Sequence, residues 1–209
     1  MADLLAEGLA RLGLPRGERE VGLLTAYAGQ ITLWNRRTNL VRAVGDELVV
    51  RHILDSLAGA RLVEERAGAG PVADAGSGAG LPGLPLAIVL PGLRFALIER
   101  AATRASFLRA CVALLGLANV EVVEADVSRL AGRSFPLVVF RAFRPLARSL
   151  AETEGVIAPA GAAAAYAGRR EALDRELAQL PAGFVLERVA RVEVPFLAAE
   201  RHIALVARR

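Results

Sequence analysis

Apolar residues recur at helical spacing from the start of the chain to about residue 66. Repeats of three and four residues place them on one face of a helix, and such a face packs against a core. The pattern predicts three or four helices with no strand between them, forming an N-terminal helical segment (residues 1–66) packed on the rest of the protein. The positions are Leu4, Leu5, Leu9 and Leu12, then Val21, Leu24, Ala28 and Ile31, then Leu48, Val49, His52, Ile53 and Ser56.

Beyond Gly70 the pattern changes to short apolar runs that alternate with amphipathic stretches. This alternation predicts an α/β fold, with a mostly parallel sheet covered on both faces, and residues 67–209 as one compact unit. The last two runs have no helix between them, so we expect them to pair antiparallel. The expected strands are 72–75, 94–99, 119–125, 136–142, 161–168, 184–196 and 201–209, and the expected helices are 84–90, 103–116, 145–157 and 169–180.

The composition narrows the class of protein. The 209 residues, with a net charge of +4, suffice for one well-buried domain. No stretch offers the roughly 20 uninterrupted apolar residues of a membrane span, and the first residues do not resemble a secretory signal. The single cysteine, Cys111, excludes an internal disulfide and fits a reducing compartment. We therefore expect a cytoplasmic protein that has no membrane partner.

The sequence DAGSGAG, which begins at Asp74, places an acid before closely spaced glycines at the end of the first expected strand. Ligands of parallel α/β sheets bind at this end of the strands, and glycines let them approach the backbone. Gly78, Gly80 and Gly83 also match the dinucleotide spacing G-x-G-x-x-G. The acid favours S-adenosylmethionine, which carries an ammonium and a sulfonium and has no pyrophosphate. We expect this cofactor, with Asp74, Gly76, Gly78 and Gly80 in its binding site.

Two further acids follow the next two expected strands. Glu99 ends the second strand, where a carboxylate can accept both hydroxyl groups of a ribose. Asp126 follows the third strand and is placed to approach an adenine edge, together with the backbone of Val127 and Ser128. The alternative is that both acids only cap helices or lie in solvent at the strand ends. Three acids at three successive strand ends favour the cofactor site.

Six segments, in their order along the chain, resemble those of one family. From Tyr27 to His202, the chain is similar to the glucose-inhibited division protein B family, whose members methylate ring nitrogen 7 of a guanine in bacterial 16S ribosomal RNA. This resemblance implies a Rossmann-like class I methyltransferase with seven strands, the last of them antiparallel. The segments are WNRRTNLV, RHILDSL, DAGSGAGLPGLPLAI, FLRACVALLGL, FRAF and ERH.

The resemblance also implies site residues. Family members often carry a lysine where this chain has Ala167, so Arg169 or Arg170 is a candidate to supply that charge. The position of Ser128 is often acidic in the family, but a backbone contact survives the change. The implied cofactor contacts are Gly76, Leu81, Glu99, Val127, Ser128 and Arg141.

The chemistry of the implied reaction demands little from the side chains. Ring nitrogen 7 of guanine has a lone pair and no proton, so its attack on a methyl group needs no general base. Positioning alone can contribute roughly 7–11 kcal/mol to lowering a barrier. Arg141 and Arg144 end the fourth expected strand, and arginine is the usual partner of the guanine oxygen beside this nitrogen. We expect Arg141 to position the cofactor or the base and Arg144 to contact the RNA, with no metal ion. The alternative for Arg144 is a solvated charge at the rim of the site.

The helical segment carries the other candidates for RNA binding. Arg36 and Arg37, beside Trp34, make a basic face with Arg42 and Arg51, since arginines bind phosphates and aromatic rings stack on bases. His52 and Asp55 lie three residues apart on one helix face. They form either a hydrogen-bonded seam between helices and sheet or, for His52, a direct RNA contact. Trp34, the single tryptophan, is alternatively a core residue.

Two other functions compete with RNA methylation. One is a small-molecule methyltransferase that uses the helical segment as a lid, and the other is a dinucleotide-binding protein. For the favoured function we expect a monomer that acts on 16S ribosomal RNA or on an assembly intermediate of the small subunit.

Overall fold

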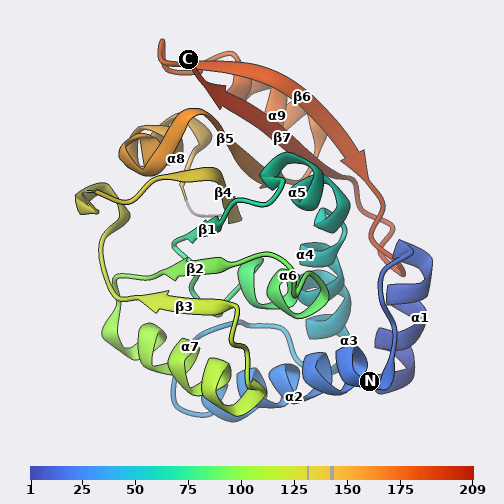
Figure 1. Ribbon diagram of the computed structural model, residues 1–209. Helices are drawn as coiled ribbons and strands as arrows, with labels where there is room; N and C mark the ends of the chain where they lie inside the picture. Colours follow the sequence, from blue (N-terminus) through green and yellow to red (C-terminus); the bar gives the residue numbers. More distant parts are fainter. Residues whose placement is uncertain (131, 142–143) are drawn as a thin grey trace.

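Seven strands of the described residues form one sheet in the order β3-β2-β1-β4-β5-β7-β6. The computed structural model describes residues 1–130, 132–141 and 144–209. Strands β1 to β5 are parallel, and β7 runs antiparallel between β5 and β6, so the predicted fold is confirmed (Figure 1). The strands are β1 (Val72–Ala75), β2 (Phe95–Ile98), β3 (Val120–Val123), β4 (Phe135–Arg141), β5 (Ile157–Ala167), β6 (Phe184–Val192) and β7 (Arg201–Arg208).

The helices follow the predicted order, and residues 1–67 contain no strand. One helical stretch within them, residues 45–57, is π-helical in its middle. The first helices are α1 (Ala2–Leu12), α2 (Glu18–Asn35), α3 (Gly45–Leu48), the π-helix η1 (Val49–Leu54), α4 (Asp55–Leu57) and α5 (Ala60–Ala67). The later ones are α6 (Gly83–Val89), α7 (Ala102–Leu115), α8 (Leu146–Thr153) and α9 (Arg170–Leu177), with 3-10 turns η2 (Val127–Arg129) and η3 (Glu154–Val156).

The fifth strand begins earlier than its pattern predicts. Phe135 of β4 pairs with Ile157 and Leu137 pairs with Ala162, so residues 158–161 bulge out of the ladder. Pro159 in this bulge has no N–H group to donate, which disfavours regular pairing. The predicted start at residue 161 is therefore wrong, and the preceding helix is correspondingly shorter. Ala142, the last residue of the strand predicted before it, lies outside the described residues.

Both faces of the sheet are buried at its central strands, where successive residues point to opposite sides, whereas the edge strands β3 and β6 are more exposed. Val72 and Val139 face a core shared with the N-terminal helices, α6 and α7. Ala73 and Phe140 face a second core formed with α8 and α9. The prediction of a sheet covered on both faces is thus correct.

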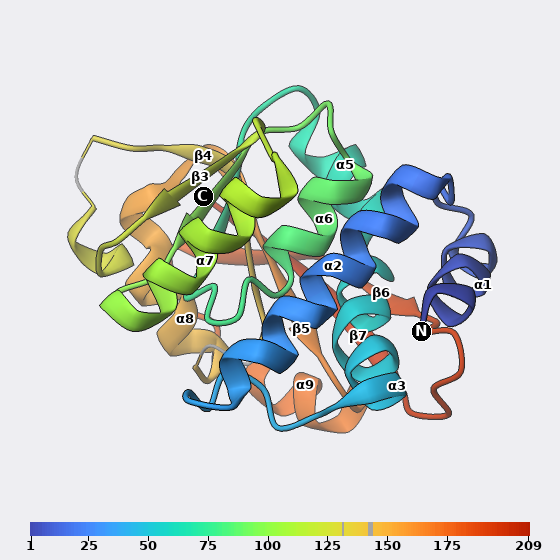
Figure 2. The same ribbon diagram turned by 90° about the horizontal axis from the view of Figure 1, so that it is seen from below.

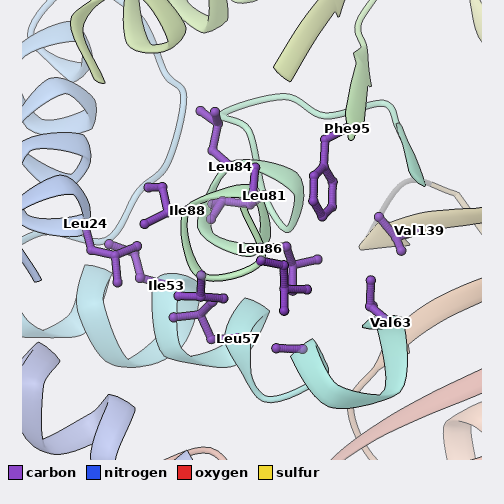
Figure 3. Close-up of a cluster of buried hydrophobic side chains, with 14 of the residues drawn as sticks. Leu24, Ile53, Leu57, Val63, Leu81, Leu84, Leu86, Ile88, Phe95 and Val139 are labelled. Carbon is purple, nitrogen blue, oxygen red and sulfur yellow. The ribbon is translucent and has the colours of Figure 1, made fainter. Parts of the chain in front are cut away.

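The N-terminal helices complete the first of these cores. Leu24 of α2, Ile53 of η1 and Ile88 of α6 lie where these three helices meet (Figure 3). Farther along α2, the ring of Trp34 meets the ring of Phe107 in α7 edge-on, with 5.4 Å between centroids. Trp34 is therefore engaged in packing, and the helical segment shares its core with the sheet. The division at residue 66 stays a prediction.

The strand order reverses between β1 and β4, which lie side by side in the sheet. At such a switch point the connections leave toward opposite sides and open a crevice at the carboxyl ends of the strands. The glycine loop follows β1, so the fold places it at this crevice. Figure 2 views the molecule along a direction turned by 90° and shows α2, α8, α9 and the 45–57 stretch around the sheet.

Replacing Leu24 with alanine should lower the free energy of unfolding by about 2–5 kcal/mol, because it leaves a cavity among fully buried side chains. Leu33 on the same helix is 52% exposed, and Leu33→Ala should change stability by no more than about 0.5 kcal/mol. Denaturant unfolding followed by circular dichroism measures both. Equally small effects would contradict the packing of α2 in the core.

Candidate active site

The glycine loop has a backbone that only glycine adopts without strain. Gly76 and Gly78 have φ angles of 68° and 58°, in the left-handed region that disfavours residues with a Cβ. Both line the larger cavity of the structure. A Cβ on Gly78 would meet nothing closer than the Gly76 carbonyl oxygen at 3.8 Å. The loop therefore presents bare backbone to open space, as a closely approaching ligand requires.

Asp74 braces this loop from beneath. Its Oδ2 accepts a hydrogen bond from the Gly83 backbone N–H at 2.9 Å, and its backbone carbonyl accepts one from the Ser77 hydroxyl at 2.8 Å. The side chain is fully buried, and burial raises the pKa of this carboxyl to about 7. Oδ1 is buried without a hydrogen-bond partner among the described residues. Asp74 is thus oriented toward the start of α6, and it is not among the residues that line either cavity.

Glu99 braces the loop from the side of β2. Its Oε2 accepts from the Gly78 N–H at 3.0 Å, and its Oε1 accepts from the Ala101 N–H at 2.8 Å. Only 4% of the residue is exposed, yet it lines the smaller cavity. Each carboxylate oxygen keeps a further lone pair for a ligand hydroxyl.

A third contact reaches the loop from the helical segment. The hydroxyl of Tyr27, a fully buried residue of α2, donates to the Ala79 carbonyl oxygen at 2.6 Å. The sequence pattern identifies Tyr27 only as part of the region of family resemblance. The structure makes it a direct link between the N-terminal helices and the loop.

The larger cavity has a volume of about 830 Å³ and lies between the glycine loop, the 45–57 stretch, the ends of β4 and β5, and α9. Its walls are rich in arginine, which attracts an anionic ligand and suits phosphate groups. The arginines that line it are Arg42, Arg51, Arg104, Arg141, Arg144, Arg169 and Arg201.

One carboxylate in this cavity holds two arginines. Arg141, at the end of β4, donates to Asp55 Oδ2 at 2.9 Å, and Arg201, at the start of β7, donates to Asp55 Oδ1 at 2.6 Å. The Asp55 side chain is 8% exposed. Because the helical stretch supplies the acid and the strands supply the cations, Asp55 ties the helical segment to the sheet. This is the seam that the spacing of His52 and Asp55 suggests.

His52 joins the same cluster. Arg141 Nη2 lies 3.1 Å from its Nδ1, and since arginine only donates, Nδ1 accepts and the imidazole is neutral. Burial, and next the adjacent Arg141 guanidinium, lower the pKa of His52 to about 4. The ring therefore carries no charge near neutral pH. π-helical turns such as the one that presents His52 are frequent at functional sites.

The smaller cavity, of about 180 Å³, adjoins the larger one, because Gly76, Arg104 and Arg144 line both. Glu99, Asp126 and Val127 also line it. Asp126 caps η2, accepting from the Ser128 N–H at 3.1 Å and from its hydroxyl at 2.7 Å. Asp126 therefore both caps η2 and lines the smaller cavity. One elongated ligand can pass from one cavity into the other.

The predicted site residues divide into two groups. Gly76, Gly78, Leu81, Arg51, His52, Arg141 and Arg144 line the larger cavity, and Gly76, Glu99, Asp126, Val127 and Arg144 line the smaller one. Asp74, Gly80, Ser128, Arg36 and Arg37 line neither. A Cβ on Gly80 would lie 2.5 Å from Leu84 Cδ1, so this glycine faces the core and allows close packing of α6. Ala142 and Phe143 of the FRAF segment lie outside the described residues.

Arg36 and Arg37 are exposed at the end of α2, next to a loop that reaches the larger cavity. Asn35 fixes this loop: its side chain donates to the Val41 carbonyl at 2.6 Å and accepts from the Leu40 N–H at 3.1 Å. Leu40 and Val41 line the cavity. Asn35 in the WNRRTNLV segment therefore shapes a cavity wall, a role that only the fold reveals.

Arg169 and Arg170, the two candidates to replace the lysine that family members often carry at the position of Ala167, have different surroundings. Arg169 lines the larger cavity, as does Ala167 itself. Arg170 instead donates to Asp174 one helical turn away, at 2.7 Å. Of the two, Arg169 is the one that faces the site. Sequence reasoning also missed Arg201 and Glu176, which line the cavity. Arg201 lies within the ERH segment, but the pattern gives it no role, and Glu176 lies outside the six segments.

Residues 1–130, 132–141 and 144–209 contain neither a cluster of metal ligands nor a membrane-spanning helix. No three His, Cys, Asp or Glu side chains gather there in a way that could hold a metal ion. None of the helices in the same ranges has the length and apolar character needed to cross a membrane.

The raised pKa of Asp74 predicts a pH-dependent stability. The unfolded chain loses this proton near the ordinary value of 3.8, whereas the folded protein holds it up to about 7, so stability falls as the pH rises through this window. Asp74→Asn keeps an acceptor for the Gly83 N–H without the charge. We expect the free energy of unfolding of the variant to exceed that of the wild type increasingly as the pH rises, by up to about 4 kcal/mol near pH 8. Near pH 4 this difference should disappear. Thermal unfolding without ligand measures this, and a difference independent of pH would contradict the buried location.

Comparison with known proteins agrees with this geometry. Residues 21–204 match the family GidB, rRNA small subunit methyltransferase G. The chain is 38% identical over 201 residues to the ribosomal RNA small subunit methyltransferase G of Serratia proteamaculans (strain 568), covering 95% of each chain. It is 35% identical over 209 residues to the protein of the same name from Enterobacter sp. (strain 638), covering 99% of this chain and 98% of that one.

Solved structures resemble the fold at lower identity. The mitomycin 7-O-methyltransferase MmcR matches with a TM-score of 0.57 and 16% identity, covering 75% of this chain and 53% of that one. TrmN from Thermus thermophilus matches with a TM-score of 0.53 and 20% identity, covering 77% of this chain and 53% of that one. These likenesses support the Rossmann-like methyltransferase fold, whereas the near full-length relatives establish the family. The chain belongs to the rRNA small subunit methyltransferase G family.

Proposed function

We propose that this protein transfers a methyl group from S-adenosylmethionine to ring nitrogen 7 of a guanine in bacterial 16S ribosomal RNA. The observation that carries the proposal is the larger cavity, which is lined both by a bare glycine loop and by seven arginines, with the smaller cavity beside it. The loop suits a cofactor that comes close to the backbone, and the wall suits a polyanion. Relatives named ribosomal RNA small subunit methyltransferase G favour RNA as the substrate over a small molecule.

The residues around the loop fit the cofactor. When bound, S-adenosylmethionine supplies a methyl group on a positively charged sulfur. Gly76, Gly78 and Leu81 would hold it from the loop, and Glu99, Asp126 and Val127 from the smaller cavity. Asp74, Gly80 and Tyr27 act indirectly, by keeping the loop in shape. Ser128 acts by orienting Asp126 through their hydrogen bonds.

The protein's part in the reaction is positioning. Guanine nitrogen 7 needs no base to remove a proton, and the neutral His52, already engaged by Arg141, is not required as one. Arg141 is fixed by Asp55, His52 and the Arg51 carbonyl oxygen, so it presents a preorganised cation to the bound groups. Arg144, at the junction of the two cavities, is placed to contact the target nucleotide. Such preorganised charges act without reorganisation during the reaction.

The RNA approaches over the exposed arginines around the larger cavity. Arg42, Arg51 and Arg169 line its rim, and Arg36 and Arg37 extend the basic surface along the end of α2. The target base enters flipped out of its stack, since the glycine loop lies inside a cavity that a paired base cannot reach. We further propose that the protein works as a cytoplasmic monomer, that residues 1–66 and 67–209 act as one unit, and that the substrate is 16S ribosomal RNA or a small-subunit assembly intermediate.

A methyl-transfer assay on small-subunit RNA, followed by mapping of the modified base, tests the function. We expect one guanine modified at nitrogen 7. Transfer only to small molecules would contradict the RNA substrate. Calorimetry with S-adenosylhomocysteine and with NAD tests the cofactor: tight binding of NAD alone would replace the methyltransferase by a dinucleotide-binding protein.

Gly78→Val should abolish binding of S-adenosylhomocysteine, because it strains the loop and places a branched side chain in the cavity. Gly116 is a matched control, since its φ of 61° imposes similar strain with nothing within 4 Å of an added Cβ. Gly116→Val should keep the affinity for the ligand unchanged. Calorimetry measures both, with circular dichroism to verify folding. A folded Gly78→Val protein with wild-type affinity would show that the loop does not hold the cofactor.

A further inference from the structure

Acidic side chains are rare around the larger cavity. Among the described residues that line it, only Asp55 and Glu176 are acids, beside seven arginines. The charge of Asp55 is shared between two guanidinium groups, those of Arg141 and Arg201, which makes Glu176 the stronger candidate acceptor for a ligand that presents hydrogen-bond donors.

Glu176 is held in place through Oε2, whereas its Oε1 has no hydrogen-bond partner among residues 1–130, 132–141 and 144–209. Oε2 also keeps a second lone pair. Its Oε2 accepts from the Leu146 backbone N–H at 2.6 Å, at the first turn of α8. This bond anchors a side chain of α9 against a neighbouring helix, since α8 and α9 pack together. The anchored side chain lines the cavity on the α9 side. An anchored carboxylate loses less freedom when it binds a ligand.

The fold places Glu176 opposite the glycine loop. The loop follows β1 and α9 follows β5, with β4 between these strands in the sheet. Two strand spacings amount to about 10 Å, which is comparable to the length of a purine ring, and both the loop and Glu176 line the same cavity. A guanine whose nitrogen 7 faces the loop side directs its opposite edge, with ring nitrogen 1 and the exocyclic amine, toward α9.

That edge of guanine carries two adjacent donors, the N–H at ring nitrogen 1 and the exocyclic amino group. A carboxylate accepts from both, whereas adenine offers an acceptor at the same ring position. Enzymes that extrude a base commonly read it through this edge. We propose that Glu176 is a specificity-determining residue that recognises the target guanine by accepting these two hydrogen bonds. The inference rests on the proposed function of the site.

Glu176→Gln separates this role from the capping of α8. The amide oxygen still accepts from the Leu146 N–H, but the second acceptor becomes an NH₂ donor that opposes the donors of guanine. We expect kcat/KM for RNA to fall about 10- to 100-fold, with unchanged affinity for S-adenosylhomocysteine and an unchanged melting temperature. Glu171→Gln, an exposed site on the same helix that lines neither cavity, should match the wild type.

A second experiment changes the target base in the RNA instead of the protein. Small-subunit RNA is prepared with inosine, which lacks the exocyclic amine, at the position that the wild type methylates. The wild type should prefer guanine over inosine by about 10-fold or more, and Glu176→Gln should bring this ratio close to one. A capping role alone would leave the ratio unchanged.

The results distinguish the inference from the function on which it rests. Wild-type protein that makes no nitrogen-7 methylguanine in RNA overturns the proposed function. Wild-type protein that methylates the guanine but treats inosine equally well, or a Glu176→Gln variant with wild-type kcat/KM and base preference, overturns the role of Glu176. If the variant does not fold, the inosine arm with wild-type protein still overturns the inference when guanine and inosine react equally well.

Discussion

The site depends on a backbone loop that two buried carboxylates hold open. Asp74 binds the N–H of Gly83 and Glu99 binds the N–H of Gly78, so both ends of the loop are fixed from inside the protein. Without these bonds, glycines with positive φ would have many conformations, because glycine has the largest conformational freedom. Burial of Asp74 costs stability when the group is charged, as its raised pKa indicates. The buried Asp74 thus lowers the stability of the folded protein while it keeps the loop rigid, and such local destabilisation is common at functional sites.

The N-terminal helical segment also holds the loop and the arginines of the site in place. Tyr27 reaches the loop from α2, and Asp55 reaches the ends of β4 and β7 by holding Arg141 and Arg201. One carboxylate between two guanidinium groups leaves an excess positive charge, and the neutral His52 does not add to it. The segment therefore closes the cavity, orients its cations and keeps it electropositive. A site for methyl transfer to RNA needs these properties together: a bare cofactor loop, fixed charges and a basic entrance.

Periodicity along the chain predicts most of the fold, because helices and strands bury one face at different spacings. The glycines and acids at strand ends predict where the cofactor site lies, because parallel strands end at the same edge. The direction of side chains cannot be predicted from these patterns, because it depends on three-dimensional packing. Asp74 faces α6 and Gly80 faces the core. The early start of β5 depends on its register with β4. Arg201 and Glu176 are missed for a related reason, since their partners lie 146 and 30 residues away in the chain.

A crystal structure of the protein with S-adenosylhomocysteine would show whether the loop between Asp74 and Glu99 holds the cofactor. We expect the ligand to contact the backbone of Gly76 and Gly78, its ribose to lie against Glu99, and its sulfur to face the arginine-lined cavity. The hydrogen bonds from Gly83 to Asp74 and from Tyr27 to Ala79 should persist in the complex. A ligand bound elsewhere, or a loop whose backbone rearranges and breaks these bonds, would contradict the account.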